Sequence, residues 1–285
     1  MENKAIGLIT GAIKSKGQFL ALATKIRLNG GRDELLYFAF PKLKGLLFTL
    51  QSKLALMHES GAFNTTQSNQ ETDQEQARYR QETMAFTDAE LTAPDGKKGV
   101  NILTTLPGNG YITLNIERID GQQVNIDISD AAIEIFTGYI LHTLKAAGGE
   151  ALMERAISNL DFMGLYFVEY KTNGELDYKY FNQDPWQMNA LKHHMAILYT
   201  VKNGSKKDVK CAAIVKTSIP SGTQETLDMA KRVAEANPQL AAYQHRFDTI
   251  YTHILHNPTD QPMELDAALD VLSRLYLTHS AAGNA

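Results

Sequence analysis

The sequence contains a single cysteine and no long apolar run, and each of these absences excludes a class of protein. Cys211 leaves no partner for an intrachain disulfide and too few thiols for a cysteine-based zinc site. No run of about 18 apolar residues occurs, so the sequence predicts no membrane-spanning helix. The first residues also lack the long apolar core of a secretory signal. We therefore expect a cytoplasmic protein with no membrane partner.

Recognisable catalytic motifs are absent as well. The sequence has no G-x-S-x-G nucleophile elbow, no H-E-x-x-H zinc motif, no kinase signature and no EF-hand loop. Gly7, Gly11 and Gly17 do not form a phosphate loop, because the Gly-Lys-Ser/Thr ending that holds phosphates is missing. We expect no cofactor, and the sequence favours a non-enzymatic protein without excluding an enzyme.

The net charge of −4 conceals blocks of opposite sign along the chain. Residues 1–60 and 163–216 carry net charges of +5 and +3, whereas residues 61–162 and 217–285 carry −8 and −4. No single polycationic tail of the kind that binds nucleic acid non-specifically is present. The simplest interpretation is that the blocks neutralise one another or face water.

The first half of the chain repeats one order of predicted elements. Three strands precede a helix that begins at Pro41, and three further strands precede a helix that begins at Asp130 and ends at Gly148-Gly149. The strands are predicted at 5–13, 18–28, 34–40, 98–106, 110–119 and 123–129. Residues 27–30 and 118–121 place similar turns in both copies, so the half is either a duplicated unit or a coincidence of two common motifs.

The segment between these two copies, residues 61–83, is rich in Gln, Asn, Thr and Glu. Such a composition buries little apolar surface, so we predict an exposed loop, with a short solvated helix around residues 74–83 as the alternative. Exposure predicts early tryptic cleavage at Arg78 and Arg80 and makes the segment a candidate contact region.

The second half combines hairpins with helices. Strands at 162–170 and 175–181 flank Asn173-Gly174, which predicts a two-residue turn that pairs Tyr166 with Phe181. A short helix opens at Asp184-Pro185, and strands at 194–202 and 208–217 form a second hairpin. Residues from Ser221 onward are predicted helical, with Ser221 and Gln224 as a capping box and with breaks at Pro238 and Pro258.

The sequence therefore predicts an α+β fold in which two meander-plus-helix units precede two β-hairpins covered by C-terminal helices. We place a β-rich domain at residues 1–147 and a hairpin-plus-helices domain at residues 150–285. The polar segment 61–83 joins the two units of the first domain.

Aromatic and basic residues gather in the predicted hairpins. Bases stack on exposed aromatic rings while lysines neutralise phosphates, so this combination suits a binder of single-stranded nucleic acid. The alternative is that the aromatics fill the core against the C-terminal helices. The candidate nucleic-acid contacts are Tyr170, Lys171, Tyr178, Lys202, Lys206, Lys207 and Lys210.

A third hypothesis places a metal or acid–base site on the helix predicted after Pro238. His245, Asp248 and His256 follow one another at helical spacing, together with Thr252, and such side chains hold borderline metals or move protons. The alternative is a solvated polar face. Cys211 lies in an apolar predicted strand and is expected to be buried and inert.

Complete folding signals beside missing catalytic motifs favour a non-catalytic binding or assembly protein. Its partner would be another protein or a second copy of itself. A polar pocket of several hundred Å³ would count against this interpretation, and an exposed apolar patch would support it.

Overall fold

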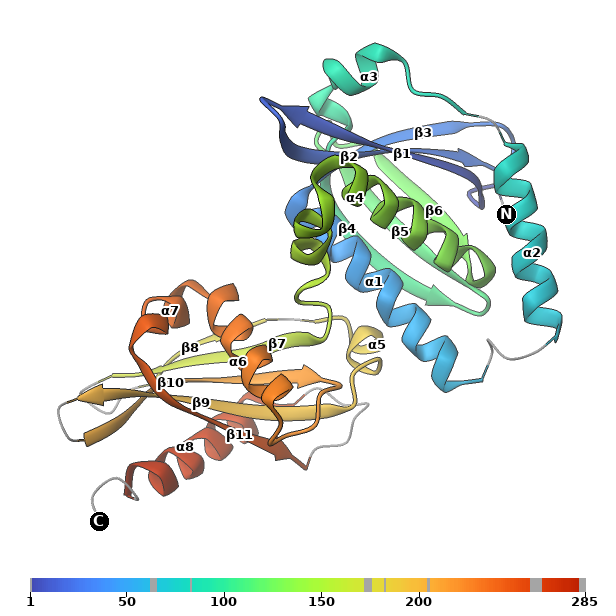
Figure 1. Ribbon diagram of the computed structural model, residues 1–285. Helices are drawn as coiled ribbons and strands as arrows, with labels where there is room; N and C mark the ends of the chain where they lie inside the picture. Colours follow the sequence, from blue (N-terminus) through green and yellow to red (C-terminus); the bar gives the residue numbers. More distant parts are fainter. Residues whose placement is uncertain are drawn as a thin grey trace. The chain divides into compact units, whose positions relative to one another are not determined.

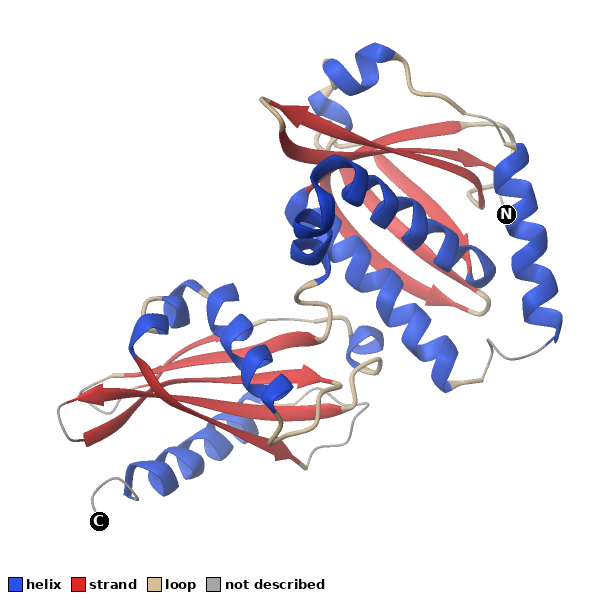
Figure 2. Cartoon of the chain, viewed as in Figure 1, coloured by secondary structure: helices blue, strands red, loops and turns tan. Residues whose placement is uncertain are grey.

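The computed structural model has an α+β fold with three antiparallel sheets, as the sequence predicts (Figures 1 and 2). The chain forms two compact units, residues 1–158 and 159–285. No helix among the described residues is long and apolar enough to cross a membrane. The structure describes residues 2–61, 66–82, 84–171, 176–181, 183–203, 206–256 and 263–281.

The N-terminal unit contains two three-stranded meanders, each followed by a helix, in the predicted order. Contacts join α1 to α4, so the two long helices lie side by side (Figure 1). The first set comprises β1 (Ala5–Ser15), β2 (Gln18–Leu28), β3 (Asp33–Ala39) and α1 (Phe40–Glu59). The second comprises β4 (Val100–Gly108), β5 (Tyr111–Arg118), β6 (Gln123–Ser129), the 3-10 turn η3 (Asp130–Ala132) and α4 (Ile133–Ile157).

The two sets match residue by residue at a separation of 90 in the second turn and the third strand. Gly31 and Gly121 both have positive φ, and their N–H groups donate to the carbonyls of Leu28 and Arg118. Glycine suits this position because it adopts positive φ without steric cost. Buried residues follow the same separation: Leu22, Ile26, Leu36, Phe38, Leu43 and Leu50 correspond to Ile112, Ile116, Ile126, Ile128, Ile133 and Ile140.

The two sheets also meet in matching ways. A parallel bridge joins Lys4 to Asp127, and another joins Gly99 to Tyr37. Lys4 and Gly99 each lie just before the first strand of their set, and Tyr37 and Asp127 occupy equivalent positions in β3 and β6. The same arrangement of elements therefore occurs twice around an approximate two-fold relation.

The predicted glycine stop at Gly148-Gly149 interrupts α4. Gly149 has a φ of 68°, and helical structure resumes after it to Ile157. The N-terminal unit therefore extends to residue 158, about ten residues beyond the boundary expected from the glycine pair.

The prediction of an exposed loop between the two sets is wrong for most of its length. Residues Thr66–Gln81 form the helix α2, in which Tyr79 is buried and packs edge-on against Phe136, with ring centroids 5.9 Å apart. The Lys4 Nζ atom lies 2.5 Å from Glu75 Oε1. One aromatic ring and one ion pair thus hold a helix whose average composition is strongly polar. Residues 62–65 and 83 lie outside the described part.

The segment after α2 crosses the outer face of the first sheet. It contains α3 (Asp88–Thr92) and the 3-10 turn η2 (Gly96–Lys98). Phe86 and Leu91 pack there against a cluster that includes Leu35 and Tyr37. Gly11 allows this close approach, because a Cβ atom at that position would lie 2.9 Å from Leu91 Cδ2. We call residue 82 and residues 84–95 the strap.

The C-terminal unit contains one five-stranded sheet with the strand order β11-β9-β10-β7-β8. Both predicted hairpins form, but their turn residues 173, 174 and 204 lie outside the described part. Tyr166 pairs with Tyr180 and not with Phe181, because five residues separate β7 from β8 where a two-residue turn was expected. The hairpin strands are β7 (Phe162–Tyr170), β8 (Leu176–Tyr180), β9 (His193–Asn203) and β10 (Lys206–Thr217).

The helix predicted after Pro238 is largely replaced by a strand. The helix α7 (Pro238–Ala241) lasts one turn, and after the 3-10 turn η4 (Gln244–Arg246) the chain forms β11 (Phe247–Leu255) beside β9. The aromatic and β-branched residues of β11 suit a sheet, where sheet packing overrides the helical spacing of its polar residues. Pro258 lies outside the described part.

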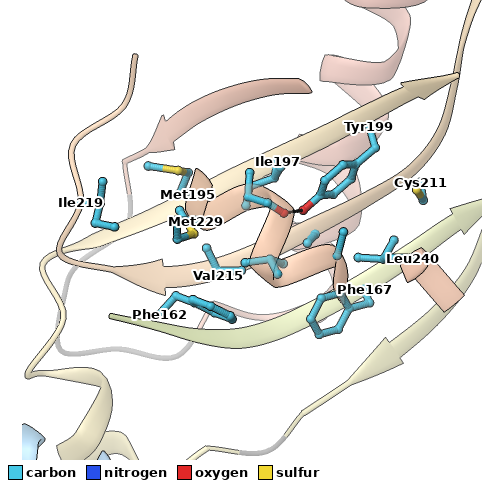
Figure 3. Packing of buried hydrophobic residues seen from close by; sticks show 14 residues of the cluster. Phe162, Phe167, Met195, Ile197, Tyr199, Cys211, Val215, Ile219, Met229 and Leu240 are labelled. Carbon is cyan, nitrogen blue, oxygen red and sulfur yellow. Dashed lines mark hydrogen bonds between the residues drawn. The ribbon is translucent and has the colours of Figure 1, made fainter. Parts of the chain in front are cut away.

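Helices cover both faces of this sheet (Figure 1). The helix α6 (Gln224–Ala236) packs on a buried cluster that contains Cys211, and the Tyr199 hydroxyl donates to the carbonyl of Ala230 at 2.7 Å (Figure 3). Cys211 is buried as predicted, and burial raises the pKa of its thiol. The helices α8 (Leu265–Ala281), on the other face, and α5 (Pro185–Met188) complete the unit.

The expected capping box of α6 is displaced by two residues. Thr223 caps the helix together with Thr226, and the hydroxyl of Ser221 instead donates to the carbonyl of Thr252 in β11. The Ser221 hydroxyl therefore gives a hydrogen bond to one backbone carbonyl of the edge strand β11.

Candidate ligand-binding pocket

A polar cavity of about 530 Å³ lies within the N-terminal unit, between α2, the end of α1 and the start of α4. We call it the α2 pocket. A volume of this size is typical of a small-molecule site. Its described lining residues are Lys4, Met57, Glu71, Thr72, Gln74, Glu75, Arg78, Gly110, Ser129, Asp130, Ala131 and Glu134.

One of the lining acids, Asp130, forms an ion pair with Lys53 of α1, which lies outside the lining. The Lys53 Nζ atom lies 3.0 Å from Asp130 Oδ1, and Lys53 is almost fully buried. Asp130 opens the 3-10 turn that leads into α4, where the helix N-terminus favours a carboxylate. The equivalent position of the first set is Phe40, so this acid belongs to the second set alone.

Two buried oxygen atoms at this pocket have no hydrogen-bond partner among the described residues. They are Glu75 Oε2, whose companion Oε1 pairs with Lys4, and the hydroxyl of Ser129. A buried polar atom without a partner costs about 1–3 kcal/mol, so such atoms usually contact water or a ligand. Glu75 and Ser129, which line the pocket, therefore each carry a buried oxygen atom without a partner among the described residues.

Carboxylates outnumber cations around the pocket. Glu71, Glu75, Asp130 and Glu134 face a space that Lys4 and Arg78 also line. Lys4 and Lys53 compensate two of the four acids. Arg78 is a third cation, so the excess is one carboxylate, which favours a ligand that donates hydrogen bonds.

A second cavity of about 390 Å³ lies against the same helix. Its described lining is mostly apolar and aromatic and consists of Gln76, Tyr79, Ile135, Gly138, Tyr139 and His142. The Tyr79 hydroxyl is buried without a described partner, and burial followed by the Glu75 charge raises its pKa. The helix α2 therefore supplies walls to two cavities of different polarity.

The predicted nucleic-acid residues are only partly exposed. Tyr170 is covered by α8, because its ring stacks on Tyr276 with centroids 4.6 Å apart and its hydroxyl donates to the carbonyl of Leu272. Tyr170 is therefore not free to stack on a base. Tyr178 and Tyr180, by contrast, are about half exposed on the edge strand β8.

The predicted lysines are divided among three strands or their ends. Lys171 lies 3.6 Å from Asp177, and Lys210 lies 3.5 Å from Asp208. Lys202 is exposed on β9, which is three strands away from β8. The side chains of Lys206 and Lys207 lie outside the described part. The structure therefore does not bring these lysines together with Tyr178 in one described cluster.

The predicted metal residues are separated by the strand that replaces their helix. His245 lies in η4, Asp248 in β11 and His256 just after β11, and all three are exposed. Eight residues of strand place Asp248 and His256 about 26 Å apart. The described residues contain no group of three or more His, Cys, Asp or Glu arranged to hold a metal.

Sequence reasoning did not identify the pocket residues, because they come from four distant segments. Lys4 precedes β1, Met57 belongs to α1, Glu75 to α2 and Asp130 to η3. The one available signal was Asp130 as a helix-opening residue, and it carried no information about a ligand. A cavity of 530 Å³ is of the size that we expected to count against a non-catalytic binding or assembly protein.

The fold and the pocket define an α+β protein with a ligand-sized polar cavity in its N-terminal half. The chain belongs to the YjeJ-like family, whose model matches residues 1–282 and so spans both units. It is similar to the uncharacterized protein YjeJ of Escherichia coli K12, with 28% identity over 270 residues that cover 94% of this chain and 93% of that protein. No solved structure matches the chain.

Proposed function

We propose that this protein is a non-catalytic binding protein whose α2 pocket holds a small organic cation. The observation that carries the proposal is the pair of buried acceptors, Glu75 Oε2 and Ser129 Oγ, that lack described partners in a cavity of ligand size. An ammonium or guanidinium group supplies several donors and a positive charge, which match these acceptors and the acidic lining.

Binding without catalysis is supported by the chemistry of the lining. Its described residues include no histidine or cysteine, and two of its carboxylates are paired with lysines. The ligand-sized cavity moves our interpretation from assembly alone towards the binding of a small molecule.

Calorimetric titration with putrescine and agmatine tests this proposal, with succinate and inorganic phosphate as anionic comparators. We expect an amine to bind and the anions not to bind. Glu75→Gln and Ser129→Ala should each weaken the amine about tenfold or more, the value of a hydrogen bond to a charged group. Glu150→Gln, an exposed control on the same unit, should leave the affinity unchanged. Tighter binding of the anions, or equal binding by all variants, would exclude the proposal.

Protein contact remains the second part of the proposal. Ile102 and Leu106 are 46% and 61% exposed on the second sheet. In strand pairing they correspond to Gly7 and Gly11 of the first sheet, because their partners in the second strand of each sheet match at a separation of 90 residues. The strap covers the outer face of that first sheet. An uncovered apolar pair on a sheet supports contact with a partner. Sedimentation analysis should detect self-association that Ile102→Ser with Leu106→Ser abolishes, and a monomer at all concentrations would leave only other proteins as partners.

Single-stranded nucleic acid is the alternative ligand, and the exposure of Tyr178 and Tyr180 on β8 favours it. We expect any such binding to depend on Tyr178 and on Lys202 and to weaken with salt. An electrophoretic mobility assay at two salt concentrations tests it, and the absence of a shift at low salt would exclude this alternative.

We also propose that the two meander-plus-helix sets arose by duplication, because their buried positions and turns match at a separation of 90 residues.

A further inference from the structure

Two histidine side chains meet where the end of α8 lies on the C-terminal sheet. The Nε2 atoms of His253, in β11, and His279, in the last turns of α8, are 2.9 Å apart. The His279 ring also stacks on Tyr251, with centroids 3.9 Å apart. The contacts join the C-terminal end of α8 to the edge strand of the sheet.

The distance between the two nitrogen atoms limits how many protons the pair can hold. A neutral imidazole has one N–H donor and one acceptor nitrogen, so a separation of 2.9 Å fits one hydrogen bond with a single proton between the rings. A single positive charge on the pair keeps this hydrogen bond, because an imidazolium ring can donate to its neutral neighbour. When both rings are protonated, both Nε2 atoms are donors and two positive charges face each other, so protonation of the second ring opposes the contact.

The groups around the pair do not compensate a second charge. No described ion pair joins either ring to a carboxylate. On the neighbouring strand β9, His194 is buried and neither of its ring nitrogens has a described partner. On β10, Lys216 donates to the carbonyl of Leu191 and adds a positive charge next to His194. Tyr251 contributes an aromatic face rather than an anion.

Burial also opposes protonation of the two histidine rings. It lowers the pKa of both His253 and His279, and the neighbouring His279 lowers the pKa of His253 further. Both rings are therefore mostly neutral at pH 7 and resist protonation at mild acidity.

We propose that His253 and His279 form a proton-operated latch that holds the end of α8 on the sheet while at least one ring is neutral and releases it when both rings are protonated. Release is confined to the last turns, because the Tyr170 hydroxyl and the ring stack with Tyr276 hold α8 further towards its N-terminus. Opening would uncover Tyr251 and His253 at the sheet edge.

Hydrogen exchange of the full-length protein, followed by mass spectrometry at pH 7.5 and pH 5.5, tests the latch. After correction for intrinsic exchange, the equilibrium constant for opening of residues 277–281 should rise about tenfold for each unit by which the pH falls. This holds over the pH range in which the open form binds one proton more than the closed form. Peptides from β9, which contains His194, and from β10 report global unfolding. Their hydrogen exchange should change less between the two pH values. Equal protection of residues 277–281 at the two pH values would overturn the proposal.

His279→Phe provides the matched variant, because phenylalanine keeps the stack on Tyr251 and cannot bind a proton. It should keep residues 277–281 protected at pH 5.5, whereas His245→Gln, at an exposed histidine, should behave as the wild type. If His279→Phe does not fold, NMR titration of the wild-type imidazoles replaces it. Two coupled titrations below the usual histidine pKa support the latch, and independent titrations near pH 6.5 contradict it. Protection by zinc at pH 7.5 with no effect of pH would instead assign the pair to a metal.

Discussion

Individual residues explain why two similar halves of the N-terminal unit have different surfaces. Gly7 and Gly11 leave room for the strap on the first sheet, whereas the equivalent Ile102 and Leu106 project from the second. The sequence indicated that these glycines do not bind phosphate, but it could not identify their neighbours. Contacts between segments 70–80 residues apart have no signature in local spacing.

Gly7→Ala tests the fit of the strap. A Cβ atom at residue 7 would lie 2.9 Å from Glu82 Cβ, an atom too close to the backbone to swing away. We expect a loss of about 1–3 kcal/mol in the free energy of unfolding, the usual cost of overpacking. Gly45→Ala, in open space on α1, should instead stabilise by about 0.5–1 kcal/mol. Urea unfolding measures both, and unchanged stability of Gly7→Ala would show that the strap does not pack there.

His194 predicts a pH dependence of stability. Burial, followed by the charge of Lys216, lowers the pKa of His194 to about 4 in the folded protein. The unfolded chain, with a pKa near 6.5, binds more protons between these values, so stability should decline as the pH falls from about 6.5 to 4. Urea unfolding across this range should show a shallower slope for His194→Leu than for the wild type. Identical slopes would mean that His194 is solvated.

At the scale of elements, periodicity and turn residues predicted most strands and helices, and the failures have physical causes. The polar composition of α2 predicts a loop, yet Tyr79 and Glu75 hold one face of the segment in place as a helix. The polar residues of β11 have a spacing that predicts a helix, but hydrogen bonding to β9 determines the conformation of this segment. In both cases tertiary contacts override the local pattern.

The docking of α2 reverses the expectation of early tryptic cleavage at Arg78. Proteases need a locally unfolded segment, and Tyr79 anchors the helix at this point. We expect Tyr79→Ser to accelerate cleavage after Arg78 about tenfold or more, because it removes a buried ring worth about 3 kcal/mol or more. Cleavage after Arg246 in the other unit is the internal control. Equal rates at Arg78 in both proteins would mean that α2 is not held by Tyr79.

At the scale of the whole molecule, the sequence predicted the α+β class but not the candidate site. The fold class follows from the order of strands and helices, which is a local property. The α2 pocket instead joins Lys4, Met57, Glu75 and Asp130, whose proximity depends on how the two meander-plus-helix sets and α2 pack. No motif records such a site, because each residue is unremarkable in its own segment.

A crystal structure of the protein soaked with its best-binding amine tests the central claim most directly. We predict ligand density in the α2 pocket, with a nitrogen atom within about 3.2 Å of both Glu75 Oε2 and Ser129 Oγ. Such contacts would give partners to the two oxygen atoms that have none among the described residues. Water alone at these two oxygen atoms, with the amine bound elsewhere or absent, would contradict the account.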